Sequence, residues 1–137
     1  WLDRSHRART SAEVVRALHH TRIVMLNNFV AYQNGRALVR ALRPVIEYVR
    51  GRCAELASQI ENATISMQNN LAEGSRRAGK DRRRLFTYAD GSLSEIAGAI
   101  ETAEDLGWPV DLSIVAPLID RQSRLLWGLT HDRRRTG

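Results

Sequence analysis

The chain has 137 residues, a formal net charge of +6 at pH 7 and a hydrophobic share of 43%. A chain of this length folds most often as one domain, and a hydrophobic share of this size excludes wholesale disorder. Proline is rare, at three residues, which favours helix. No uncharged apolar run approaches the roughly eighteen residues that a membrane span needs, so we expect no membrane partner.

The charge and the cysteine content indicate which partners and which cellular compartment to expect. A pI of about 10.6 points to polyanions, of which nucleic acid is the commonest. The single cysteine, Cys53, excludes an internal disulfide and suits a reducing compartment, so we expect a cytoplasmic protein. The simplest interpretation of Cys53 is a small residue that lines a helix.

Residues 1–26 are expected to form an N-terminal extension that is only partly helical. Residues 1–10 are polar and show no hydrophobic period, and no apolar segment of a signal peptide follows them. Thr10 or Ser11 can cap a helix that begins at Ala12, because a hydroxyl accepts bonds from the free N–H groups of a first turn.

The beginning of the sequence raises a question about its natural boundaries. Trp1 is not a natural translation start, so we expect either that the chain is a fragment or that the gene boundaries are uncertain. The first stretch is expected to be either an extra N-terminal helix or translated upstream sequence. Met25 is a candidate start, and Asn27 and Asn28 offer a second helix cap just after it.

Four apolar stripes at three- and four-residue spacing follow, and each predicts one face of a helix. The first predicted helix spans residues 29–50, with a kink expected at Pro44 because the carbonyl four residues earlier loses its donor. Gly51 can end it. The stripes are Leu38, Ala41, Leu42, Val45, Ile46 and Val49; Leu56, Ile60, Ala63, Met67 and Leu71; Leu85, Ala89, Ser92, Ile96, Ile100, Ala103 and Leu106; and Leu112, Val115, Ile119, Leu126 and Leu129.

The ends of the later helices are marked by glycine, aspartate and proline. The second stripe ends at Gly74 and the third at Gly107, where glycine favours helix termination. Asp111 can cap the last helix, and Pro117 is expected to weaken its first turns. Alternating β-branched runs are short, so strands are not predicted. The sequence therefore predicts an all-α, antiparallel up-and-down four-helix bundle over residues 27–131.

A basic tail at residues 132–137 is expected to be disordered.

The string from Gly74 to Lys80 has the spacing of a phosphate-binding GxxxxGK loop. That loop must leave a strand and must be followed by a hydroxyl that binds magnesium. A predicted helix precedes the string here and Asp81 follows it, so nucleotide hydrolysis is not predicted.

Other catalytic and metal sites are equally unsupported. The predicted helices carry no Glu-x-x-His pair of the kind that di-iron bundles use. A cluster of Glu101, Glu104 and Asp105 lies opposite the apolar stripe and is best explained as a solvated face. Ser92 has no histidine or lysine base at a recognisable spacing. We therefore expect no enzyme, no cofactor, no metal site and no small-molecule substrate.

Six basic residues crowd the predicted turn between the second and third bundle helices. Like charges repel at such a corner, arginine suits bidentate contact with phosphate, and a helix N-terminus adds a partial positive charge. The alternative is a merely solvated corner. Only Phe86 and Tyr88 are aromatic nearby, so contact with the backbone of a structured nucleic acid fits better than base stacking. The predicted nucleic-acid-binding residues are Arg76, Arg77, Lys80, Arg82, Arg83 and Arg84.

Four short motifs in a fixed order carry a family resemblance. Ser58-Gln59-Ile60, Asn70-Leu71-Ala72-Glu73-Gly74, Gly91-Ser92-Leu93 with Glu95, and Leu106-Gly107 before an aromatic residue resemble the proteins encoded by intervening sequences of bacterial 23S ribosomal RNA genes. Their distant relatives include the accessory variability determinant of diversity-generating retroelements. The similarity covers roughly residues 29–129. Each motif alone is weak, and their order makes the set specific.

The resemblance implies a cytosolic, non-enzymatic bundle that assembles as a ring, with a homopentamer expected. The retroelement relatives bind nucleic acid and a reverse transcriptase through a basic surface, so both become expected partners. Asp90 departs from the family pattern, which often has a basic residue there. A protein-binding or structural oligomer without a nucleic-acid role stays open as the alternative. The signature positions, with an expected structural role, are Asn70, Glu73, Gly74, Gly91, Ser92 and Glu95.

Overall fold

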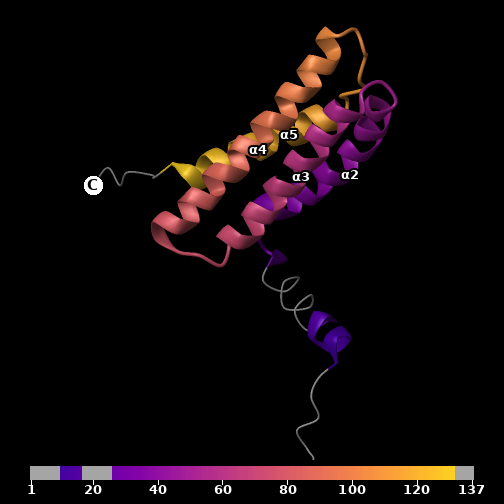
Figure 1. Ribbon diagram of the computed structural model, residues 1–137. Coiled ribbons are helices and arrows are strands. Elements are labelled where there is room, and N and C mark those ends of the chain that lie inside the picture. The colour runs from indigo at the N-terminus through magenta and orange to yellow at the C-terminus, as the bar shows by residue number, and fades with distance from the viewer. Residues whose placement is uncertain (1–9, 17–25, 132–137) are drawn as a thin grey trace, which may run out of the picture.

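The computed structural model describes residues 10–16 and 26–131, and these ranges contain helices and connecting turns without strands (Figure 1). A short helical segment covers residues 11–16. The predicted all-α bundle is confirmed. The tail at 132–137 and most of the N-terminal extension lie outside the described residues. The bundle helices are α2 (Val30–Arg50), α3 (Ala54–Gly74), α4 (Gly79–Asp105) and α5 (Val115–Thr130).

Consecutive bundle helices run in opposite directions and lie side by side (Figure 1). Contacts join α2 to α3, α3 to α4 and α4 to α5, and α5 closes the bundle against α2. This order brings the α3–α4 connection, the beginning of α2 and the end of α5 to one end of the bundle. No helix in the described part of the chain is long and apolar enough to cross a membrane.

The core follows the predicted apolar stripes. Each of the four helices turns most of its stripe inward, and one contiguous cluster results, whereas Leu106 at the end of the third stripe is 57% exposed. Full burial of a single leucine or isoleucine side chain stabilises a fold by about 1.5–3 kcal/mol, so these faces drive the helices together. Side chains with almost no exposed surface include Leu38, Leu42, Ile60, Met67, Ile96 and Leu126.

A pair of buried amides joins α2 to α5 across this core. The Asn34 Nδ2 group donates to Gln122 Oε1 at 2.7 Å, and Gln122 Nε2 donates to the Ala31 carbonyl at 2.9 Å. Asn34 Nδ2 also lies 3.2 Å from the Leu118 carbonyl. Because a buried polar group without a partner is costly, these bonds fix the register of α5 against α2.

The predicted caps at the N-terminal side had different outcomes. Thr10 caps the short helical segment, with its Oγ1 accepting from the Glu13 N–H at 3.2 Å and its own N–H donating to the Glu13 carboxylate at 2.7 Å. This reciprocal pattern is a capping box. The predicted caps at Asn27 and Asn28 are wrong, because α2 begins after Phe29 and has no side-chain cap. The Phe29 ring instead anchors the helix start by packing 5.6 Å from the Phe86 ring.

Pro44 and Pro117 lie inside helices, with different consequences. The α2 helix continues through Pro44 to Arg50. Pro117 is the third residue of α5, where it cannot donate to the Ser113 carbonyl, so the regular helix begins only at Val115. The predicted cap at Asp111 is wrong, because α5 begins only at Val115 and has no side-chain cap. Its carboxylate accepts from the Ser113 N–H at 3.0 Å in a turn before α5, and this bond lowers the pKa of Asp111.

Candidate nucleic-acid interface

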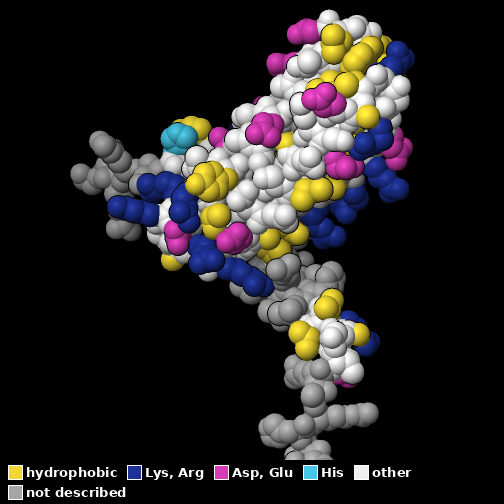
Figure 2. All heavy atoms as spheres, viewed as in Figure 1, with side chains coloured by type: hydrophobic (Ala, Val, Ile, Leu, Met, Phe, Trp, Pro, Cys, Tyr) yellow, Lys and Arg dark blue, Asp and Glu magenta, His cyan; other side chains and the backbone are white. Residues whose placement is uncertain are grey.

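The six predicted basic residues lie together at one corner of the bundle, which we call the basic corner: Arg76, Arg77, Lys80, Arg82, Arg83 and Arg84. The first two lie in the link between α3 and α4, and the other four lie in the first two turns of α4. All six side chains are exposed. Dark-blue side chains gather at this end of the bundle in Figure 2. The positive charge is therefore concentrated in space as well as in sequence.

Two glycines allow the chain to turn so tightly at the basic corner. Gly79 begins α4 with a φ of +61°, a conformation that glycine adopts without steric cost. Gly74 ends α3 against α4, and a methyl group placed on it would lie 2.6 Å from a ring atom of Phe86. This close approach brings the link residues and the first turns of α4 onto one surface. The GxxxxGK string thus joins helix to helix here.

Acidic side chains compensate only part of this charge. Arg77 pairs with Glu73 at 3.3 Å and Arg84 with Asp81 at 3.1 Å, and both pairs are about half exposed. The cations of the basic corner therefore outnumber the carboxylates paired with them. Within the described residues, neither Arg76 nor Lys80 has an ion-pair partner. Exposed pairs contribute little stability, so the fold does not depend on these charges.

The two aromatic residues near the basic corner have different roles. Phe86 is 1% exposed and belongs to the core, so its ring cannot stack on a ligand. It carries the Arg82 guanidinium, whose central carbon lies 5.2 Å from the ring centroid, and this contact orients the arginine. Tyr88 is 53% exposed on α4. Of the two, only Tyr88 offers an open aromatic surface.

Most of the signature positions have a clear structural place. The Asn70 Nδ2 group donates to the Ser66 carbonyl at 2.9 Å and lies 3.2 Å from the Ser66 hydroxyl. The Ser92 hydroxyl lies 3.0 Å from the same Ser66 hydroxyl, so a small polar network links α3 to α4. Glu73 pairs with Arg77 beside Gly74, whereas Gly91 and Glu95 lie on the exposed face of α4.

This arrangement of helices and motifs agrees with one known family. The sequence model of the 23S rRNA-intervening sequence protein family matches residues 27–117. The chain belongs to this family. Neither the curated proteins nor the solved structures gave a match.

The 23S rRNA-intervening sequence protein match covers α2, α3, α4 and the whole basic corner. It ends in the first turn of α5, whereas the motifs had suggested a similarity to about residue 129. The remainder of α5, including Gln122, therefore lies outside the matched region, although its amide holds α5 in the bundle.

Two signature glycines of this family member are expected to respond oppositely to alanine. Gly74→Ala forces a methyl group onto the buried Phe86 ring and is expected to destabilise the fold by about 1–3 kcal/mol. Gly91→Ala meets nothing within 4 Å on an exposed helical face and is expected to stabilise it by about 0.5–1 kcal/mol. Urea unfolding of both variants measures the difference. Equal effects would contradict the close approach at Gly74.

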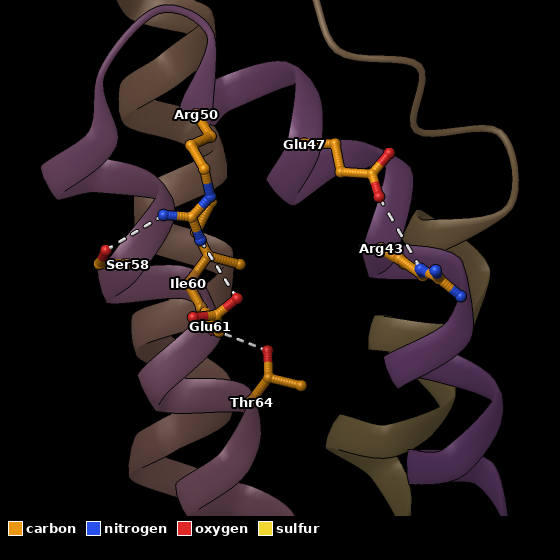
Figure 3. A network of polar contacts seen from close by, with 7 residues as sticks. All are labelled: Arg43, Glu47, Arg50, Ser58, Ile60, Glu61 and Thr64. Atoms are coloured by element: carbon orange, nitrogen blue, oxygen red, sulfur yellow. Dashed lines mark hydrogen bonds and ion pairs between the residues drawn. The ribbon is translucent and has the colours of Figure 1, made fainter.

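A second surface, the α2–α3 groove, was not predicted from the sequence. It is a hollow of about 550 Å³ between these helices, and its apolar side chains Val39 and Ile65 are exposed. Its charges are largely paired, as Figure 3 shows: Arg50 reaches across to Glu61 at 3.1 Å, and Arg43 lies 3.8 Å from Glu47. The groove therefore differs from the basic corner, where cations are in excess.

The remaining candidate residues form no reactive group in the described part of the chain. Glu101, Glu104 and Asp105 are all exposed, in agreement with a solvated face. Cys53 is a half-buried free cysteine immediately before α3. No group of three or more His, Cys, Asp or Glu side chains in residues 10–16 and 26–131 could hold a metal ion.

Proposed function

We propose that this 23S rRNA-intervening sequence family member binds the phosphate backbone of RNA or DNA through the basic corner. The observation that carries the proposal is the excess of exposed cations over paired carboxylates there, with Arg76 and Lys80 unpaired among the described residues. Guanidinium groups match phosphate oxygens in geometry as well as charge. This excess of positive charge favours a polyanionic ligand over a solvated corner.

A salt titration tests this proposal. Binding of a labelled RNA hairpin is measured by fluorescence anisotropy at salt concentrations between about 50 and 200 mM. A protein that contacts Z phosphates loses affinity with a slope of about −0.9Z for duplex DNA in a plot of log K against log salt. With four to six contacts, we expect a loss of about two to three orders of magnitude over this range. An affinity that does not change with salt would overturn the proposal.

The alternative function is that of a protein-binding or structural oligomer, and the α2–α3 groove favours it. Exposed Val39 and Ile65 between paired charges suit a protein surface better than a nucleic acid. On the family resemblance we propose self-association as a homopentamer. Light scattering at micromolar concentration is expected to give five times the 15.5 kDa mass of one chain. A monomer mass would contradict the assembly.

Self-association and nucleic-acid binding are compatible, whereas the alternative excludes a nucleic-acid role. The resemblance extends the first proposal. We propose a cytoplasmic, non-enzymatic accessory protein of bacterial origin that acts within a larger ribonucleoprotein or beside a reverse transcriptase. The family resemblance supports the non-enzymatic part. A gene for a reverse transcriptase or a ribosomal RNA next to the gene of this protein would distinguish the two settings.

A further inference from the structure

An exposed tryptophan lies near the end of α5. Trp127 is 62% exposed, although tryptophan buries more apolar surface than any other side chain when it is packed. Its ring stacks on the His131 ring, with the centroids 4.3 Å apart and the planes 16° from parallel. We call this pair the aromatic platform. It presents a flat aromatic surface to solvent, in an orientation that the histidine holds.

Contacts between helices place the aromatic platform at the level of the basic corner. Gln122 on α5 donates a hydrogen bond to the Ala31 carbonyl at the start of α2. Phe29, two residues before Ala31, packs on Phe86 of α4, and the Phe86 ring also contacts the Arg82 guanidinium. Trp127 lies five residues beyond Gln122, or about 7.5 Å further toward that end at the helical rise. This distance brings it level with the first two turns of α4.

The figures agree with this placement. Figure 1 shows α5 ending at the end of the bundle where α4 begins. Figure 2 shows histidine and hydrophobic colours at the same end of the bundle as the dark-blue Lys and Arg side chains. The aromatic platform is therefore separated from the basic corner by more than forty residues in sequence, and the fold returns it to the same end of the molecule.

We propose that Trp127 stacks on an unpaired base of the nucleic acid whose phosphates the basic corner binds. This inference rests on the proposed function and narrows its ligand class. An aromatic ring stacks on any base because every base has a π-face, but bases inside a duplex are already stacked on each other. The expected ligand therefore carries unpaired nucleotides, as in a loop, a bulge or an overhang, next to a run of phosphates. A blunt duplex would engage the basic corner alone.

Two RNAs with equal numbers of phosphates test the inference. One is a blunt duplex of two strands, which has no loop, and the other is a shorter duplex with a four-nucleotide 3′ overhang. Fluorescence anisotropy at constant salt is expected to give about ten-fold tighter binding for the overhang RNA, the lower part of the range for stacking one or two bases. Trp127→Ala is expected to abolish this preference and Trp127→Phe to retain part of it, while affinity for the blunt duplex stays unchanged.

The matched control is Ile114→Ala, which removes a side chain of similar exposure at the opposite end of the bundle. This variant is expected to leave both affinities unchanged. Circular dichroism melting of each variant excludes a folding defect. A direct readout comes from a chain with Trp1 and Trp108 replaced by phenylalanine, in which Trp127 is the remaining tryptophan. Its fluorescence is expected to be quenched by the overhang RNA and not by the blunt duplex.

The outcomes separate this inference from the proposed function. If neither RNA binds at low salt, the proposed function fails. If both bind with the same salt-dependent affinity and Trp127→Ala changes neither, nucleic-acid binding stands and the stacking inference is overturned. Stacking is also overturned if Trp127→Ala instead disperses an oligomer without altering RNA preference, since the ring would then belong to a contact between copies.

Discussion

The double variant Arg76→Ala, Lys80→Ala is expected to bind an RNA hairpin about 10- to 100-fold more weakly than the natural chain at about 0.1 M salt. These two side chains have no carboxylate partner among the described residues, so their charges are free to meet phosphate. Each contact contributes about 0.9 to the salt slope, and the slope is therefore expected to fall by roughly two. Anisotropy titrations at several salt concentrations measure both quantities.

A second double variant controls for net charge. Arg36→Ala, Arg40→Ala also removes two positive charges, but both side chains lie exposed on α2, outside the basic corner. It is expected to lower affinity less than about three-fold, through long-range attraction alone. Equal losses in the two double variants would mean that the chain attracts nucleic acid by its overall charge, without a defined site.

Replacement of Gln122 by alanine is expected to lower the free energy of unfolding by about 2–4 kcal/mol. Gln122 has no exposed surface and holds Asn34 and the Ala31 carbonyl at once. The variant leaves a cavity and a buried amide with one partner fewer. Urea unfolding followed by circular dichroism measures the loss, with Gln59→Ala on the exposed face of α3 as the control, expected within about 0.5 kcal/mol of the natural chain.

Further variants separate the contribution of the hydrogen bonds to stability from that of the side-chain volume of Gln122. Gln122→Met keeps most of the side-chain volume and removes both amide bonds, so it reports the cost of leaving Asn34 with the Leu118 carbonyl as its remaining partner. The combination with Asn34→Leu is expected to recover most of that loss, because no polar group is then left without a partner. If the combined variant loses more free energy of unfolding than the two single variants lose together, the amide pair does not act as one unit.

The helices with regular apolar stripes were predictable, because burial alone determines which face turns inward. The end of α3 at Gly74 and the stripe of α4 came directly from the spacing of residues such as Met67 and Ile96. The start of α5 was not predictable from the stripe, since Leu112 continues the apolar pattern while Pro117 forbids the bond that would extend the helix. Local backbone chemistry decided that boundary.

The candidate site shows a similar division. The basic corner was visible because its residues are close in sequence and a turn keeps them close in space. The aromatic platform was missed because Trp127 comes more than forty residues later and lies on a different helix. The Asn34–Gln122 pair was missed for another reason: amide side chains are usually solvent-exposed, and nothing in the sequence indicates that two of them meet in a core.

The stack of Arg82 on Phe86 gives the basic corner a mechanical connection to the core. Phe86 also holds the ring of Phe29, on which α2 begins, so the three side chains form a short relay from the surface to the far helix. A ligand that immobilises Arg82 would steady the start of α2 as well. Linked equilibria are reciprocal, so fraying of the first turn of α2 would in turn weaken ligand binding by Arg82. Ligand occupancy at this end of the bundle and order at the start of α2 would therefore increase or decrease together.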